Sequence, residues 1–180
     1  MTSQAGLFSY YIRDARNGIA AKHVRGTRVL DMGCNSGYLR KFLPTGIEYV
    51  GVDVRPPFGA DFLYHQRGIH DSLHDLGTFD TIFLLATIEH LTKITEALEN
   101  LTPLLRKGGQ LIITTPSPLG DNIHHMGSKI GLFSSAAADE HEKIFNLEEL
   151  NALLKSVKLD VTTSSTFLFG LNQLVIGEKK

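Results

Sequence analysis

The sequence has little of what marks secreted, membrane or nucleic-acid-binding proteins. It contains one cysteine, Cys34, so an intramolecular disulfide is impossible. No apolar run approaches the ~18–20 residues of a membrane span, and the first residues lack the basic and apolar stretches of a signal peptide. Lys plus Arg number 18 against 19 Asp plus Glu, so the formal net charge is only −1 and does not attract nucleic acid or an anionic membrane. We therefore expect a soluble, cytoplasmic protein with no membrane contact.

The remaining composition fits one globular domain. Of the 180 residues, 42% are hydrophobic, which is enough for a core and too many for a disordered chain. Domains of ~100–200 residues are typical, and the chain shows no repeat and no low-complexity tract. We expect a single domain over residues 1–180.

The spacing of apolar residues predicts alternating strands and helices. Helical spacing occurs over four ranges: 7–24, 38–43, 91–105 (interrupted by Pro103 and ended by Gly108-Gly109) and 146–157. Strand patterns occur over seven ranges: 28–31, 48–54, 61–65, 79–85, 110–115, 158–163 and 166–178. The alternation through residue 115 predicts an open α/β sheet. The last two strands are joined only by a turn, which predicts an antiparallel edge.

The stretch Asp31-Met-Gly33-Cys-Asn-Ser-Gly37 joins the first strand to the next helix through a glycine turn. Such a turn brings backbone amides to a ligand at the carboxyl edge of the sheet. Asp53 lies 22 residues after Asp31, at the end of the second strand, where a carboxylate can accept hydrogen bonds from two ribose hydroxyls. A dinucleotide fingerprint needs glycine where this chain has Asn35 and Tyr38. The pyrophosphate signature is therefore absent.

Four segments, in this order, resemble the motifs of class I S-adenosylmethionine-dependent methyltransferases. They are the turn at 31–37, the strand end at 49–54, the strand and helix start at 79–91, and the "GG, strand, Pro" segment at 105–116. The resemblance implies a doubly wound, mainly parallel seven-stranded sheet of the Rossmann-like type, with an antiparallel C-terminal edge strand. It implies S-adenosyl-L-methionine as the cofactor. Within the class, the chain looks most like the quinone-pathway O-methyltransferases.

The resemblance also assigns cofactor contacts. Asp31 suits the ammonium, amides of the turn suit the carboxylate, and Asp53 suits the ribose diol. Val54 can cover the adenine, and the carbonyls at the end of 79–85 can accept from the ammonium. The implied cofactor residues are Asp31, Gly33, Cys34, Asn35, Gly37, Asp53, Val54, Asp71, Leu85 and Ala86.

Three of these positions need comment. Asn35 stands where the family usually has a middle glycine, and asparagine tolerates a left-handed backbone better than other non-glycine residues. The Cys34 side chain is interpreted as a small apolar filler rather than a nucleophile. Asp71 is the best match for an acidic residue that holds the adenine N6, with Asp75 as a competitor.

Histidines supply the candidate bases for methyl transfer, because a hydroxyl acceptor must lose a proton. His90 and His141 are the catalytic candidates, and His124 and His125 lie in an irregular stretch, 116–145, which we expect to form a lid over the acceptor. Three further histidines are expected on the adenine side: His65, His70 and His74. The Glu89-His90 pair with the later His141 also resembles a metal site of some methyltransferases. Ala86 stands at the first Glu position of that pattern, so we expect no metal.

The expected activity is O- or N-methylation of a small-molecule acceptor. No Asn-Pro-Pro or Asp-Pro-Pro motif follows 79–85, which counts against methylation of DNA bases. The Glu-His and later His pattern leaves RNA 2′-O-methylation as an alternative, although the chain has no basic stripe and nucleic acid is not expected as a partner. A cofactor-binding protein without catalysis is the other alternative.

Overall fold

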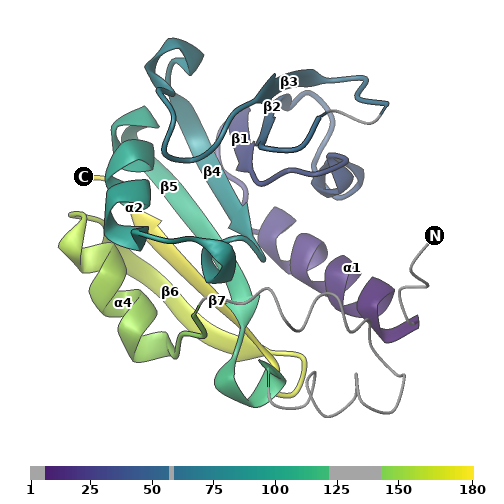
Figure 1. The fold of residues 1–180 in the computed structure, drawn as a ribbon, viewed down its shortest axis with the longest axis vertical. Helices are drawn as coiled ribbons and strands as arrows, with labels where there is room; N and C mark the ends of the chain where they lie inside the picture. Colours follow the sequence, from purple (N-terminus) through teal and green to yellow (C-terminus); the bar gives the residue numbers. More distant parts are fainter. Residues whose placement is uncertain (1–6, 57–58, 122–142) are drawn as a thin grey trace.

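The computed structural model describes residues 7–56, 59–121 and 143–180. They form one seven-stranded sheet with helices on both faces (Figure 1). The strands are β1 (Arg28–Met32), β2 (Glu48–Asp53), β3 (Leu63–Gln66), β4 (Phe79–Leu85), β5 (Leu105–Pro116), β6 (Asp160–Phe167) and β7 (Asn172–Glu178). The α-helices include α1 (Leu7–Ala21), α2 (Ile94–Leu101) and α4 (Leu147–Ser156). The predicted doubly wound α/β sheet is confirmed.

The strand order β3-β2-β1-β4-β5-β7-β6 reverses direction in sequence between β1 and β4. β1 pairs in parallel with both β2 and β4, and β2–β3 and β4–β5 are also parallel pairs. Parallel strands end at the same edge of a sheet, and open α/β sheets bind ligands in the crevice beside such a reversal. The carboxyl ends of β1, β2 and β4 therefore meet where the sequence predicts the cofactor.

The last strand runs against the others. β7 pairs antiparallel with β5 on one side and with β6 on the other. The predicted antiparallel C-terminal strand is present, one place in from the edge, and β6 forms the edge. Residues 168–171 are too short a connection for a parallel crossover, so these two strands pair as a hairpin.

Two apolar clusters hold the sheet between its helices. On one face α2 and α4 contribute Leu98 and Leu154 to a cluster that includes Ile82 of β4. On the other face α1 contributes Ala20 to a cluster that includes Phe83. Neighbouring residues of β4 thus face opposite clusters, which explains why this strand is apolar on both faces.

Two sequence expectations about helices are corrected. Only a 3-10 helix, η1 (Tyr38–Lys41), forms within 38–43, since Gly37 enters it in a left-handed conformation (φ 69°) and Pro44 follows closely. Gly108-Gly109 does not end a helix, because β5 begins at Leu105 after the 3-10 turn η4 (Thr102–Leu104), which contains Pro103. Gly108 N–H instead donates to the Lys179 carbonyl (2.7 Å), and Lys179 N–H donates to Gly109 (2.9 Å). The two glycines therefore lie in the sheet.

The start of α4 is confirmed in detail. The Asn146 side chain accepts from the Glu149 amide, and the Glu149 side chain accepts from the Asn146 amide, each at 2.9 Å. This capping box is the one that the sequence predicts.

The stretch expected to form a lid is described only at its two ends. Residues 118–121 are helical, and the chain is described again from residue 143. His124, His125 and His141 lie outside the described residues, so their roles stay predictions. Within the described part, no helix is long and apolar enough to cross a membrane.

Candidate functional site

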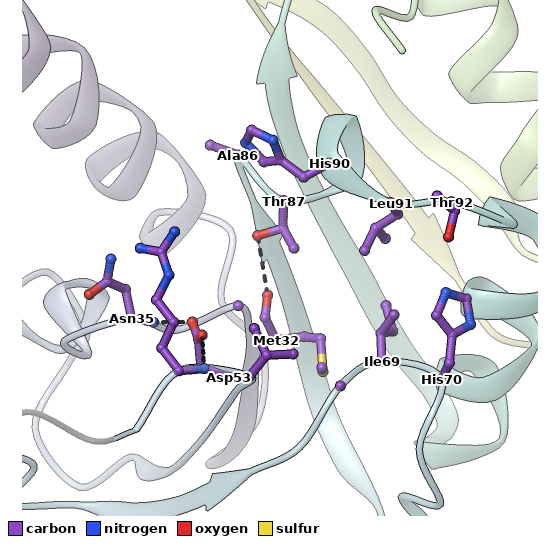
Figure 2. A pocket seen from close by; sticks show the side chains of 14 residues that line it. Met32, Asn35, Asp53, Ile69, His70, Ala86, Thr87, His90, Leu91 and Thr92 are labelled. Atoms are coloured by element: carbon purple, nitrogen blue, oxygen red, sulfur yellow. Dashed lines mark hydrogen bonds between the residues drawn. The ribbon is translucent and has the colours of Figure 1, made fainter. Parts of the chain in front are cut away.

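A cavity of about 580 Å³ opens at the carboxyl ends of β1, β2 and β4 (Figure 2). It is lined by Met32, Gly33, Asn35, Asp53, Val54, Arg55, Gly68, Ile69, His70, Ala86, Thr87, His90, Leu91 and Thr92. The cavity thus brings together the glycine turn, the end of β2, the turn before η2 (His74–Leu76) and the segment after β4. Six of the residues expected at the site lie in its wall: Gly33, Asn35, Asp53, Val54, Ala86 and His90.

The glycine turn is held by backbone hydrogen bonds, two of them to β2. The amides of Gly33 and Cys34 both donate to the Val52 carbonyl, at 2.8 and 3.1 Å, and the Gly37 amide donates to the Cys34 carbonyl at 2.8 Å. Asn35 takes the left-handed conformation (φ 48°) in place of the family's glycine. Because these amides are already bonded within the protein, the expected binding of a carboxylate by this turn needs other donors.

Asp53 is oriented toward the cavity by two backbone amides. Its Oδ2 accepts from the Asn35 amide at 2.8 Å and its Oδ1 accepts from the Arg55 amide at 2.9 Å (Figure 2). The side chain is 8% exposed, and each carboxylate oxygen can accept a further bond. The next residue, Val54, is 65% exposed and also lines the cavity. A fixed acceptor beside an apolar side chain is the arrangement expected for a ribose and its base.

Asp31 does not line the cavity. It is buried, and its Oδ2 accepts a 2.5 Å hydrogen bond from the hydroxyl of Tyr49. Burial raises the pKa of Asp31 to about 7, the Tyr49 hydrogen bond opposes that rise, and nearby Asp53 adds to it. Burial and Asp31 likewise raise the pKa of Tyr49. In this structure the Asp31 carboxylate is bonded to Tyr49 and does not contact the cavity, and its contact with the cofactor ammonium stays a prediction.

The segment after β4 closes one side of the cavity. Ala86 has a left-handed backbone (φ 50°), and its amide donates to Thr114 at 2.8 Å. The Thr87 hydroxyl donates to the carbonyls of Leu85 (3.1 Å) and Met32 (3.4 Å), the latter drawn in Figure 2. Leu85 itself does not line the cavity.

Thr87 is a site residue that the sequence analysis missed. A Cβ placed on Gly33 would lie 2.5 Å from the Thr87 hydroxyl oxygen. Gly33 therefore allows the ends of β1 and β4 to approach closely, and a hydroxyl two residues after β4 was the signal in the sequence.

His90 and its neighbour Glu89 diverge. His90 is exposed and lines the cavity (Figure 2), whereas Glu89 is 1% exposed and accepts from the Thr115 hydroxyl at 3.0 Å. The Glu89 carbonyl accepts from the Lys143 amide at 3.3 Å. Glu89 thus links β5 to the chain at Lys143, while His90 faces the cavity. In the residues that the structure describes, no three His, Cys, Asp or Glu side chains form a group that could hold a metal.

Arg16 of α1 lies outside the cavity wall but is paired across the fold. Its Nε donates to the Asn172 side chain at 2.5 Å. Burial lowers the pKa of this guanidinium, and the charge of Glu89 opposes that change. Arg16 therefore connects α1 electrostatically with the segment that carries His90.

On the adenine side, the two candidate carboxylates both bond elsewhere. Asp71 accepts from the Gly68 amide at 2.6 Å. Asp75 forms a bidentate ion pair with Arg67, with hydrogen bonds of 2.5 and 2.7 Å. Neither lines the cavity, whose wall here consists of Gly68, Ile69 and His70.

Cys34 lies in the apolar cluster on the α1 face. It is 5% exposed, and burial together with Asp31 and Asp53 raises the pKa of its thiol. A Cβ on Gly51 would lie 2.8 Å from its sulfur. Both Cys34 and Gly37 stand outside the cavity wall.

Comparison with known proteins decides the family. The methyltransferase-domain family matches residues 4–164. The chain belongs to this family. The resemblance to class I S-adenosylmethionine-dependent methyltransferases is thereby confirmed, and membership implies S-adenosylmethionine as the methyl donor.

Two curated relatives of this chain are named for different activities. This chain is 35% identical over 112 residues to a tRNA U34 carboxymethyltransferase of Idiomarina loihiensis. The match covers 53% of this chain and 35% of that protein. The chain is 30% identical over 122 residues to a ubiquinone biosynthesis O-methyltransferase of Bradyrhizobium sp. (strain ORS 278), covering 58% of this chain and 48% of that protein. The chain thus spans between a third and a half of the length of these relatives.

Solved structures share the fold at low identity. An O-methyltransferase family protein from Burkholderia thailandensis superposes with a TM-score of 0.71 at 14% identity, over 96% of this chain and 56% of that chain. The 1,6-didemethyltoxoflavin-N1-methyltransferase of the same organism, solved with its substrate and S-adenosylhomocysteine, gives 0.70 at 19% identity over 96% and 82%. These matches confirm the methyltransferase fold.

Proposed function

We propose that this chain binds S-adenosylmethionine in the cavity beside β1, β2 and β4 and transfers its methyl group to a small-molecule acceptor. The observation that carries the proposal is Asp53. Its two carboxylate oxygens are fixed by the amides of Asn35 and Arg55, and it faces the same cavity as exposed Val54. A ribose diol needs two fixed acceptors, and the adenine beyond it needs an apolar wall.

The rest of the cofactor follows from the lining. The apolar side chains of Val54, Ile69 and Leu91 line the part assigned to the adenine. The methionine part is assigned to the side of Gly33, Ala86 and Thr87, where β1 and β4 end. Asp31 lies behind this wall, so we assign the ammonium to backbone carbonyls at the ends of β1 and β4 rather than to that carboxylate.

The charge distribution supports a small acceptor. In the described part, nine Lys and Arg side chains already pair with carboxylates: Arg13, Arg25, Arg28, Arg40, Arg67, Lys93, Arg106, Lys143 and Lys180. Of the lining residues only Arg55 is a lysine or arginine. An RNA backbone is held by several unpaired cations. The tRNA-modifying relative is matched over 35% of its own length, so this similarity supports the cofactor domain more than an RNA acceptor.

Methyl transfer requires donor and acceptor in line. A lone pair of the acceptor oxygen or nitrogen attacks the methyl carbon, the carbon–sulfur bond breaks, and the sulfonium becomes a neutral thioether. The acceptor proton must then leave. His90, exposed and in the wall, is the described residue placed to take it, and His141 is a second candidate outside the described residues. Holding the two reactants in line supplies much of the rate.

Transfer of a labelled methyl group from S-adenosylmethionine tests the acceptor class. We expect incorporation into a member of a panel of phenols, quinols and amines, and none into total RNA. With that acceptor, His90→Ala should lower kcat by about 10²–10⁴ if the proton leaves to His90. His74→Ala is the matched control, since His74 is exposed and outside the cavity wall. Incorporation into RNA alone would contradict the small-molecule assignment.

A further inference from the structure

We infer that the imidazole of His70 recognises the adenine of the cofactor, in the place where the family resemblance implies a carboxylate. The inference rests on the proposed cofactor site and adds a specificity-determining residue to it.

The turn at 68–71 is built so that Asp71 serves the turn itself. The Asp71 side chain accepts from the Gly68 amide at 2.6 Å, and the Asp71 amide donates back to the Gly68 carbonyl at 3.1 Å. From α2, the Asn100 amide nitrogen donates to the carbonyls of Ile69 and Asp71, both at 2.8 Å. The backbone that carries His70 is therefore held from two sides.

His70 occupies the cavity wall that neither candidate carboxylate reaches. It lines the cavity together with Ile69, whereas Asp71 and Asp75 do not. Figure 2 shows His70 near Thr92, on the far side of Ile69 from Asp53. A ribose on Asp53 would thus direct its base toward Ile69 and His70.

Glu96 sets the chemistry of the imidazole. Its Oε1 lies 3.9 Å from His70 Nδ1, and its Oε2 lies 3.4 Å from Lys93 Nζ. At 3.9 Å the carboxylate makes no hydrogen bond, but its charge attracts a proton on Nδ1. It thereby favours the tautomer in which Nε2 is a hydrogen-bond acceptor. The adenine N6 is an amine and donates, whereas hypoxanthine has a carbonyl oxygen at that position. The structure therefore assigns His70 a preference for adenine over hypoxanthine.

The experiment compares S-adenosylhomocysteine with its deaminated form, S-inosylhomocysteine, by titration calorimetry on the full chain. For the parent we expect the adenine form to bind about 5–50-fold more tightly, as for one hydrogen bond exchanged for an unpaired polar contact. His70→Phe keeps a ring and removes the acceptor, so the ratio of the two affinities should fall toward one. Glu96→Gln, which removes the charge beside Nδ1, should lower the ratio partly.

Two matched variants complete the test. His74→Phe, at an exposed position outside the cavity wall, should keep the parent ratio, and so should Asp71→Asn, which still caps Gly68. The inference is overturned if Asp71→Asn abolishes the preference while His70→Phe keeps it, or if His70→Phe weakens both ligands equally. A parent that binds both ligands with equal affinity also overturns it, but leaves the cofactor site standing. A parent that binds neither refutes the proposed function as well.

Discussion

The hydroxyl of Tyr49 donates a 2.5 Å hydrogen bond to Asp31, from β2 to the end of β1. Both residues are buried, at 8% and 4% exposed. The acidic residue of the glycine motif is thus hydrogen-bonded to a neutral phenol rather than paired with a cation, so its charge is left uncompensated. This arrangement has consequences for stability that do not depend on the acceptor.

Asp31 should make the protein less stable as the pH rises from about 4 to about 7. Its pKa is raised from 3.8 to about 7 in the fold, so the folded state holds a proton that the unfolded state has lost in this interval. A difference of about three pKa units corresponds to on the order of 4 kcal/mol. Asp31→Asn removes the titration, so the difference in unfolding free energy between pH 5 and pH 8 should shrink in urea unfolding.

Asp80 provides the control for that experiment. Burial opposes its ionisation, but the amides of Arg28 and Thr27 and the Arg106 guanidinium lower its pKa. The stability that ionised Asp80 contributes is fully present above the pKa of this group in the unfolded chain. It is lost only as the pH falls below about 4. Asp80→Asn should therefore destabilise equally at pH 5 and pH 8. An unaltered pH 5 to pH 8 difference in Asp31→Asn would contradict the assignment to Asp31.

Gly37→Ala should destabilise more than Gly46→Ala. Both glycines have positive φ, 69° and 83°, but a Cβ on Gly37 would lie 2.5 Å from the Phe62 ring, while one on Gly46 meets nothing within 4 Å. We expect a loss of about 1–2 kcal/mol from the backbone at both positions. At Gly37 a further loss of about 1–3 kcal/mol from overpacking follows. Urea unfolding measures both, and equal losses would show that the Phe62 contact is unimportant.

The thiol of Cys34 should react slowly in the folded protein. It is 5% exposed, and burial raises its pKa, so little thiolate is present at pH 8. Because the sequence has one cysteine, release of the chromophore from Ellman's reagent reports this site alone. The rate should rise sharply in urea. Rapid reaction of the native protein would mean that the turn opens far more than the packing around Gly51 allows.

Cofactor binding should be independent of divalent metal. Glu89 points to Thr115 while His90 faces the cavity, so the pair does not converge on one point. We expect the same affinity for S-adenosylhomocysteine with EDTA and with added Mg²⁺ or Zn²⁺. An affinity that collapses with EDTA and returns with one of these ions would show that a metal completes the site.

The sequence was sufficient for the fold and for the edge of the sheet at which the cavity opens. Strand patterns such as 79–85 matched β4, and parallel strands share a carboxyl edge, so Asp53 and the glycine turn had to meet. The side that Asp31 faces follows from strand alternation, since it shares a face with buried Val29. The hydrogen bond from Tyr49 to Asp31, by contrast, depends on the register between β1 and β2. No local sequence pattern specifies that register.

Other features depend on contacts far apart in the sequence. Asp71 matched the family's acidic position, but its carboxylate caps its own turn, and Asn100 of α2 fixes that turn from 29 residues away. Likewise the pair Gly108-Gly109 is typical of a helix end in the sequence. In the structure both residues instead form hydrogen bonds with the backbone of Lys179. Short-range rules predict elements well and predict such pairings poorly.

Titration of S-adenosylhomocysteine into the parent and into Asp53→Ala tests the central claim most directly. The parent should bind, and the variant should lose about 1.5–3 kcal/mol of binding free energy, as expected for a charge-assisted acceptor. Asp61→Ala, at an exposed carboxylate paired with Arg40, is the matched control and should bind like the parent. Unchanged affinity in Asp53→Ala would contradict the ribose assignment, and a parent that does not bind would contradict the cofactor site itself.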